Sequence, residues 1–151
     1  MSMTNRSQEE YYKESKRIRT EVLQQAELLK GNPMRFTITN GITMDVEITK
    51  SDLRTIVSKA SSDNKFNAIK NALAKDIQSY LQKSEYIGWR ETEKGKHSES
   101  AYFAYFDRKL GVRTILAMRK IKNGGPYKPY AIIDEYSFEA NLAHLKQGTP
   151  P

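Results

Sequence analysis

One of the two histidines of the chain, His97, stands in the sequence KGKHSES, between lysines and directly before an aromatic run. An imidazole titrates near neutral pH, so it can accept the 2′-hydroxyl proton or protonate the leaving oxygen when RNA is cleaved without a metal. Glu99 lies two residues further on, and the cation of Arg119 suits the negative charge of a phosphorane. His97, Glu99 and Arg119 are therefore candidate catalytic residues. For His97 the alternative is a solvated loop position.

Basic residues of the same region could hold the phosphates of a nucleic acid. Arg113 and Arg119 are six residues apart, so on a regular strand their side chains face the same way. Between Gly88 and Lys128 the chain has ten Lys and Arg against four Asp and Glu, a net of +6, whereas the remaining residues add only +1 to the total of +7. This concentration predicts a surface for a polyanion, with RNA favoured over DNA. General solubility is the simpler alternative.

Aromatic residues gather on one predicted strand, at Tyr102, Phe103, Tyr105 and Phe106. Successive side chains of a strand alternate, so either Tyr102 and Phe106 or Phe103 and Tyr105 face away from the helices. An exposed pair would let nucleotide bases stack on it, whereas the alternative is that another element, such as the N-terminal helix, covers it. The candidate nucleic-acid-binding residues are Lys96, Tyr102, Tyr105, Arg113, Lys120, Lys122 and Tyr127.

Several classes of site are unlike this sequence. The chain has no cysteine, which excludes disulfide scaffolds, cysteine nucleophiles and zinc ribbons. It has no clustered metal ligands and no glycine-rich phosphate loop, so we expect neither a metal nor a cofactor. No apolar run approaches the roughly 20 residues of a membrane span, and the N-terminus shows no hydrophobic signal region. We therefore expect a cytoplasmic protein without a membrane partner.

The first half of the chain must supply helices and a hairpin. An amphipathic pattern predicts a helix over residues 8–30, which Gly31 and Pro33 end. Asn40-Gly41 between two β-rich runs predicts a hairpin with strands at 34–39 and 42–49. Ser51 is a candidate cap for a short helix, and one apolar stripe predicts a longer helix over 65–83.

The second half reads as consecutive antiparallel strands. A short strand is expected at 86–90, followed by strands at 101–107, 112–122 and 130–136 that are separated by glycine-containing turns. Helices followed by strands predict an α+β fold with a three- or four-stranded antiparallel sheet. We expect an N-terminal helical extension over 1–32, an α+β domain over 33–140 and a tail over 141–151.

This order of elements resembles the large-polyvalent-protein-associated domains of the barnase–EndoU–colicin–RelE nuclease class, which occur in phage and conjugative-element polyproteins. The resemblance covers about residues 35–137 and rests on RFTITNGITMDVEIT, FNAIKNALAKDIQSYLQKSEYIG, HSESAYFAYF, VRTILAMRKIKNG and YKPYAIID. It implies helices packed on a curved barnase- or RelE-like sheet with a metal-independent ribonuclease-like site on the open face. By position, His97 matches the polar residue before the first long strand and Arg119 the basic residue on the next. His144 lies in the tail, so the sheet lacks a second histidine and catalysis stays open.

Two functional hypotheses follow. The first is a basic phage or mobile-element protein of the host cytoplasm that binds RNA on its sheet, either as a binding module or as a metal-independent endoribonuclease. The second is a non-enzymatic inhibitor or adaptor that binds a host protein, for example a defence nuclease, and docks through its amphipathic N-terminal helix. The sequence does not define an oligomeric state.

Overall fold

A computed structural model describes residues 7–91, 97–121 and 125–151, with the backbone alone described for His97, Ser98 and Ile121. The described chain forms five helices and six strands, which confirms the predicted α+β class. In chain order they are α1 (Gln8–Leu28), β1 (Met34–Ile38), β2 (Met44–Ile48), α2 (Lys50–Ser58), α3 (Asn64–Lys75), α4 (Ile77–Lys83), β3 (Glu85–Glu91), β4 (His97–Asp107), β5 (Val112–Ile121), β6 (Tyr127–Asp134) and α5 (Glu135–Leu142).

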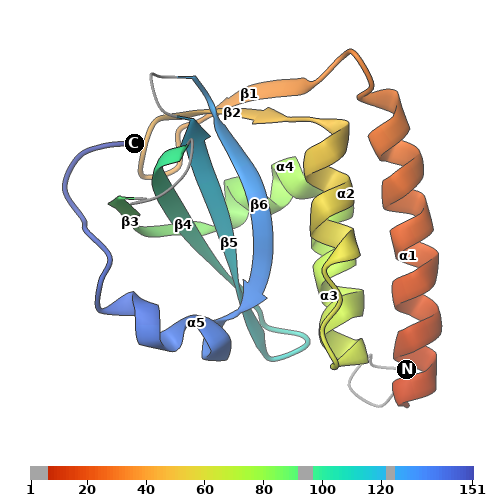
Figure 1. The fold of residues 1–151 in the computed structure, drawn as a ribbon. Coiled ribbons are helices and arrows are strands. Elements are labelled where there is room, and N and C mark those ends of the chain that lie inside the picture. Colours follow the sequence, from red (N-terminus) through yellow and green to blue (C-terminus); the bar gives the residue numbers. More distant parts are fainter. Residues whose placement is uncertain (1–6, 92–96, 122–124) are drawn as a thin grey trace.

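All the described strands belong to one sheet, in the order β1-β2-β6-β5-β4-β3 (Figure 1). Neighbouring strands are antiparallel except β2 and β6, which run parallel and share the pair Val46–Tyr127. The prediction of a three- or four-stranded barnase- or RelE-like sheet is therefore wrong in detail. The difference arises because the β1–β2 hairpin extends the sheet beyond β6, and a pairing between such distant segments has no local sequence pattern.

The helices begin where the sequence supplies side-chain caps. In α1 the Ser7 hydroxyl accepts a hydrogen bond from the Glu10 backbone N–H at 3.2 Å, and the Glu10 carboxylate accepts one from Ser7. In α2 the same capping box joins Thr49 and Asp52, so Thr49, and not the predicted Ser51, is the cap. The cap sets the start of α2 directly after β2, which places this helix beside the sheet.

The hairpin and the long predicted helix differ in how well the sequence describes them. The hairpin is confirmed, and Gly41 takes a φ of +76°, a conformation that glycine adopts without strain. The predicted helix over 65–83 is two helices, because Asp76 leaves the helical region with φ −123° and ψ 53°. The Asn40 amide donates to the carbonyls of Gln82 and Ser84, both at 2.8 Å, which ties the hairpin to the end of α4.

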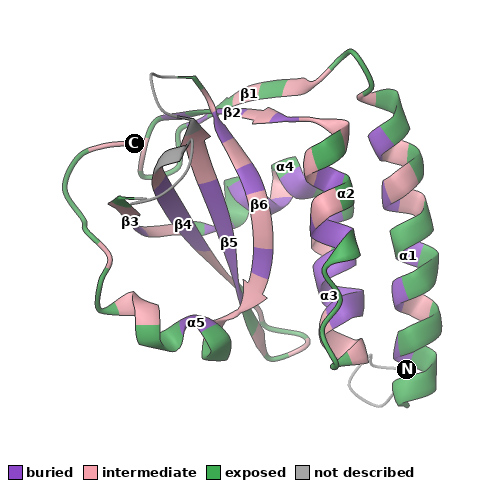
Figure 2. Cartoon of the chain, viewed as in Figure 1, coloured by how far each residue is buried: buried purple, intermediate pink, exposed green. Residues whose placement is uncertain are grey.

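The sheet has two unlike faces. We call the face covered by α2, α3 and α4 the inner face and the opposite face, which carries α5, the outer face (Figure 1). The larger core cluster lies on the inner face and includes Phe103, Leu116 and Met118. On the outer face a smaller cluster joins Ile115 and Ala117 to α5. Figure 2 shows the buried residues concentrated in the sheet and on the facing sides of α1, α2 and α3, whereas α5 carries mainly exposed and intermediate residues.

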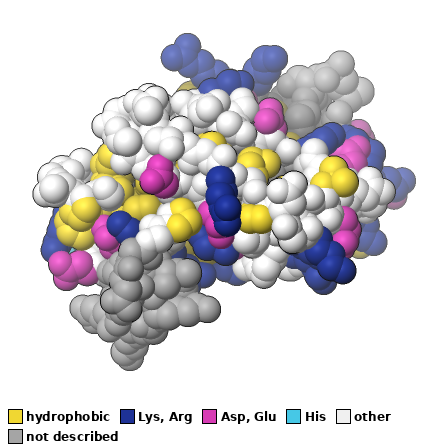
Figure 3. Space-filling view, turned by 90° about the horizontal axis from the view of Figure 1, so that it is seen from above, with side chains coloured by type: hydrophobic (Ala, Val, Ile, Leu, Met, Phe, Trp, Pro, Cys, Tyr) yellow, Lys and Arg dark blue, Asp and Glu magenta, His cyan; other side chains and the backbone are white. Residues whose placement is uncertain are grey.

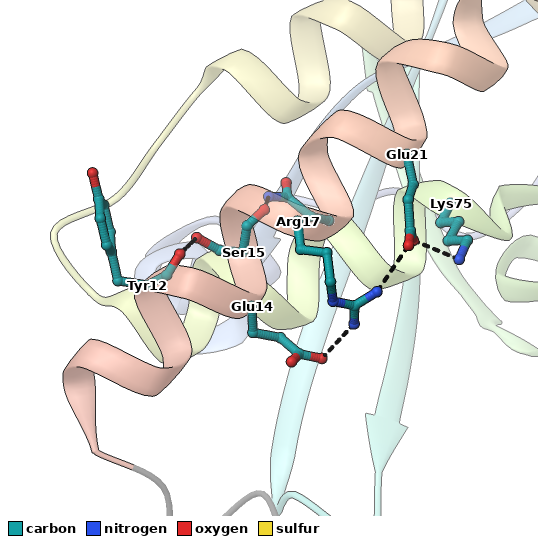
Figure 4. A network of polar contacts seen from close by, with 7 residues as sticks. Tyr12, Glu14, Ser15, Arg17, Glu21 and Lys75 are labelled. Carbon is teal, nitrogen blue, oxygen red and sulfur yellow. Dashed lines mark hydrogen bonds and ion pairs between the residues drawn. The ribbon is translucent and has the colours of Figure 1, made fainter.

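Helix α1 packs against α2 and α3, outside the helices that touch the sheet. Its apolar side, with Ile18, Val22 and Ala26, belongs to the main core cluster. On its polar side Arg17 bridges Glu14 and Glu21, and Glu21 also accepts a hydrogen bond from Lys75 of α3 at 2.6 Å (Figure 4). The apolar face that the sequence offers for docking is therefore used inside the fold. None of the described helices has the length and apolar character needed to cross a bilayer.

The segment after α5 returns along the free edge of β3. Trp89 and Lys146 exchange two backbone hydrogen bonds of 3.0 and 2.7 Å, and the Trp89 indole N–H donates to the Gly148 carbonyl at 3.0 Å. Gly88 admits this close approach, because a Cβ at that position would lie 2.8 Å from the Lys146 carbonyl oxygen. The tail therefore covers a strand edge that would otherwise be open to pairing.

Candidate nucleic-acid interface

Alternation along β5 sorts the basic candidates between the two faces of the sheet. Ile115 and Ala117 pack on the α5 side and Leu116 on the helix side, so Arg113 and Arg119 both lie on the outer face, as predicted. They are about 20 Å apart at the rise of a strand. One phosphate cannot contact both of these arginines.

Arg113 stands at the α5 end of the outer face and is already paired. Its guanidinium donates to the Glu135 carboxylate at 3.2 Å and lies 5.8 Å from the centre of the Phe106 ring. Phe106 is half-exposed and Glu135 is the first residue of α5. A phosphate at Arg113 would have to compete with Glu135, which makes Arg113 the weaker of the two predicted phosphate contacts.

Arg119 lies in a different setting, among hydroxyl groups. Its β-sheet neighbours are Ser100 on β4 and Lys128 on β6, and its guanidinium carbon is 3.9 Å from the centre of the Tyr130 ring. Lys128 is compensated by Asp52 at 3.4 Å and Glu47 at 4.0 Å. Arg119 has no ion pair with any carboxylate in the described part of the chain, so its charge is available to a ligand.

Arg90 on β3 completes this group. Its Nε donates to the Tyr102 hydroxyl at 2.8 Å, and its Nη1 donates to the Asn141 side-chain oxygen at 3.1 Å. Arg90 is opposite Ser100 in the β3–β4 pairing, so it lies on the same face as Arg119. We call these residues the outer-face cluster: Arg90, Ser100, Tyr102, Arg119 and Tyr130.

The titration of Tyr130 reflects this packing. Burial, together with the adjacent Tyr102 hydroxyl, raises the pKa of Tyr130 to about 12, while Ser100 and Arg119 act in the opposite direction. The Tyr130 hydroxyl is therefore protonated at neutral pH and can donate a hydrogen bond to an anionic oxygen. Lys59, from the end of α2, lies 5.8 Å from the centre of the same ring and donates to the Tyr130 carbonyl at 3.2 Å.

The predicted aromatic pairs split as alternation requires. Phe103 and Tyr105 face the inner side, where Tyr105 meets the ring of Tyr80 at 5.6 Å between ring centres. Tyr102 faces outward but is 1% exposed, because Phe138 of α5 covers it at 4.8 Å between ring centres. The covering element is thus α5, and not the N-terminal helix. Neither Tyr102 nor the inward-facing Tyr105 presents an open ring face for a base in this arrangement.

The predicted catalytic residues do not share one face. Glu99 pairs with Lys120 across β4 and β5, and its carboxylate lies near Tyr127 on the inner side, away from Arg119. Tyr127 is 2% exposed, and burial, with Glu99 beside it, raises its pKa well above the usual range. The Tyr127 hydroxyl and one Glu99 oxygen make no hydrogen bond with a described residue. The physical reason for the split is the pleat, which sends residues 119 and 120 to opposite faces.

Three further predicted residues fall wholly or partly outside the described structure. Lys96 and Lys122 lie outside the described residues. The backbone of His97 belongs to β4, where it pairs with Ile121, and its side chain lies outside the description. Sequence reasoning missed Arg90 altogether, and the signal that could have found it is the cross-strand pairing of the two β-rich runs at 86–90 and 101–107.

No protein-family model, curated protein or solved structure matches the chain. The functional proposal therefore depends on the geometry of the outer-face cluster and on charge.

Proposed function

We propose that this protein binds RNA, with a phosphate held at the outer-face cluster between Arg119 and Arg90. The observation that carries the proposal is the arrangement of the outer-face cluster. Arg90 and Arg119, which make no ion pair with a carboxylate in the described part of the chain, lie on one sheet face on either side of the hydroxyl-bearing residues of the cluster. Guanidinium groups suit phosphate because their N–H groups form a planar fork. The partly exposed Tyr130 adds a neutral hydroxyl, which can also contact a ribose 2′-hydroxyl and so favours RNA.

Charge supports the same assignment over a longer range. The segment 88–128 that builds most of β3, β4 and β5 carries a net +6. An excess of positive charge in one segment attracts a polyanion at long range and makes binding depend on salt. The protein-adaptor hypothesis has less support, because the apolar side of α1 that would dock a partner lies in the core.

The test is the affinity of the full chain for a single-stranded RNA of mixed sequence, measured by fluorescence anisotropy over a series of salt concentrations. We expect Arg119→Ala to weaken binding about tenfold or more and to lower the salt slope by about 0.7, the value for one phosphate contact on a single strand. Lys13→Ala, which removes one charge from an exposed position on α1, is the control. Equal affinities for wild type and Arg119→Ala would overturn the proposal.

Cleavage of the bound RNA would require a proton acceptor in addition to this cluster. His97 is the candidate that the sequence offers, and its backbone lies in β4 three residues from Ser100. The same RNA incubated in EDTA with wild type and with His97→Ala separates binding from catalysis, because the two proteins should bind equally and only a nuclease would lose activity.

A further inference from the structure

One surface hollow of the described chain lies away from the outer-face cluster, between the end of α1 and the start of α2. It has a volume of about 690 Å³. Four cationic side chains line it, from Lys30, Lys50, Arg54 and Lys59, and none of its described lining residues is acidic. We call it the α1–α2 groove. Figure 3, the view from above, shows Lys and Arg side chains gathered on the side where α1 and α2 lie, with acidic side chains among them.

One carboxylate at the margin of the groove shows how closely the cations gather. Glu27 accepts a hydrogen bond from Lys50 at 2.6 Å. That hydrogen bond and the positive charges of Lys50, Lys30 and Arg54 lower the pKa of Glu27, although burial acts in the opposite direction. Within the described chain neither Lys30 nor Arg54 makes an ion pair, so one carboxylate compensates only part of the positive charge.

The backbone adds to the positive character of the groove. Lys50 and Ser51 are the first residues of α2, and the N–H groups of a first helical turn have no partner within the helix. The Thr49 hydroxyl is occupied, since it caps the Asp52 N–H. The positive end of the α2 dipole lies beside the lysines, where the Asp52 carboxylate of the same turn offsets part of it, and hydroxyls of Thr55 and Ser58 line the same hollow.

Lys59 connects this groove to the outer-face cluster. It lines the groove, and its ammonium group donates to the Tyr130 carbonyl and lies over the Tyr130 ring. Arg119 lies against the ring of the same tyrosine. The positive groups thus continue from the groove through Lys59 to Arg119, along the length of α2, which is about 14 Å for its nine residues.

We infer that the α1–α2 groove is a second phosphate-binding subsite for the same RNA strand, so that one extended strand contacts both the groove and the outer-face cluster. The inference rests on the proposed function, since it assigns the groove to the same ligand. A strand that reaches both subsites gains affinity from the groove, whereas a strand too short to reach the groove does not.

The experiment compares a short and a long single-stranded RNA, of about 2 and about 14 nucleotides, in anisotropy titrations with the full chain. The double variant Lys30→Ala/Arg54→Ala should weaken binding of the long RNA about tenfold and lower its salt slope by about 1.4, for two lost phosphate contacts. It should leave the short RNA unchanged. Arg119→Ala should weaken both. Lys13→Ala/Lys16→Ala removes the same charge from the far end of α1 and is the control.

The outcomes separate the two proposals. Unchanged affinity and salt slope of the long RNA in the Lys30→Ala/Arg54→Ala variant would overturn the second subsite while leaving the outer-face cluster intact. Failure of the wild type to bind either RNA would overturn both. A further titration uses a poly-glutamate peptide of similar length. If the wild type binds this peptide, and the double variant loses peptide binding but keeps RNA binding, the groove is assigned to an acidic protein segment and the inference is overturned.

Discussion

A buried lysine gives the sharpest test of the physical reasoning. Lys70 of α3 is 2% exposed, and its ammonium group donates to the Lys59 carbonyl rather than to a carboxylate. Burial, with the nearby charges of Arg19 and Lys59, lowers the pKa of Lys70 from 10.5 to about 8. At 1.36 kcal/mol per pH unit, keeping this lysine protonated in the fold costs at most about 3 kcal/mol.

The sign of the pH dependence follows from the direction of the shift. Below pH 8 Lys70 is protonated in both states, so the full cost is present. Between pH 8 and 10.5 the unfolded chain binds more protons than the folded one, and stability rises with pH. We expect the contribution of Lys70 to the free energy of unfolding to increase by about 2 kcal/mol between pH 7 and 9.5. Tyr86 and Tyr130, whose pKa values are raised to about 12, act in the opposite direction only above about pH 10.

The assay is urea unfolding of wild type and Lys70→Met at intervals between pH 7 and 9.5. The informative quantity is the difference between the two free energies of unfolding, in which the tyrosines cancel. Loss of the hydrogen bond to Lys59 changes the difference between the two unfolding free energies by the same amount at every pH. Burial of the amine makes this difference change with pH. Lys13→Met, at a side chain that is 74% exposed, reports the general effect of net charge. A difference that stays level within about 0.5 kcal/mol would refute the desolvation argument.

Two further comparisons use matched positions. Gly88→Ala should release the tail from β3, because the new Cβ would lie 2.8 Å from the tail backbone, and hydrogen exchange of the Lys146 amide should become faster. Gly31 also has a positive φ but has open space around it, so Gly31→Ala should lower the free energy of unfolding by only about 1 kcal/mol. Tyr80→Phe should lose about 1 kcal/mol in urea unfolding, since its buried hydroxyl is hydrogen-bonded at 2.8 Å. Tyr127→Phe should cost less or stabilise, and a larger loss than in Tyr80→Phe would contradict this.

Local patterns predicted the elements whose cause is local. The Asn40-Gly41 pattern predicts the hairpin correctly and Gly41 takes a positive φ, although Asn40 does not and the connection runs from Thr39 to Thr43. The period of two along β5 correctly predicts that Arg113 and Arg119 share one face of the sheet. The break at Asp76 was missed because the apolar stripe continues from α3 into α4, so periodicity alone cannot reveal it.

The elements that sequence reasoning missed have distant causes. Among the described residues the hairpin joins β6 through the pair Val46–Tyr127, whose two residues lie far apart in the chain. Helix α5 has one buried residue, Phe138, so it lacks the apolar stripe that would indicate a helix, yet this residue covers Tyr102. Of the outward aromatic pair, Tyr102 is therefore covered by an element with almost no amphipathic signal, whereas Phe106 stays half-exposed.

Net charge counted along the chain does not show on which face of the sheet the basic residues lie. The described basic residues of β5 divide between two faces, with Arg119 outward and Lys120 inward, and Arg113 is paired with Glu135. The rest of the chain sums to +1, yet it builds the α1–α2 groove. Two acids of α1 are used elsewhere, since Glu14 and Glu21 are occupied by Arg17 and Lys75, as Figure 4 shows, and Glu27 pairs with only one groove lysine, Lys50. What a polyanion meets is the charge left after such pairing, so a ligand surface must be sought in the fold, residue by residue.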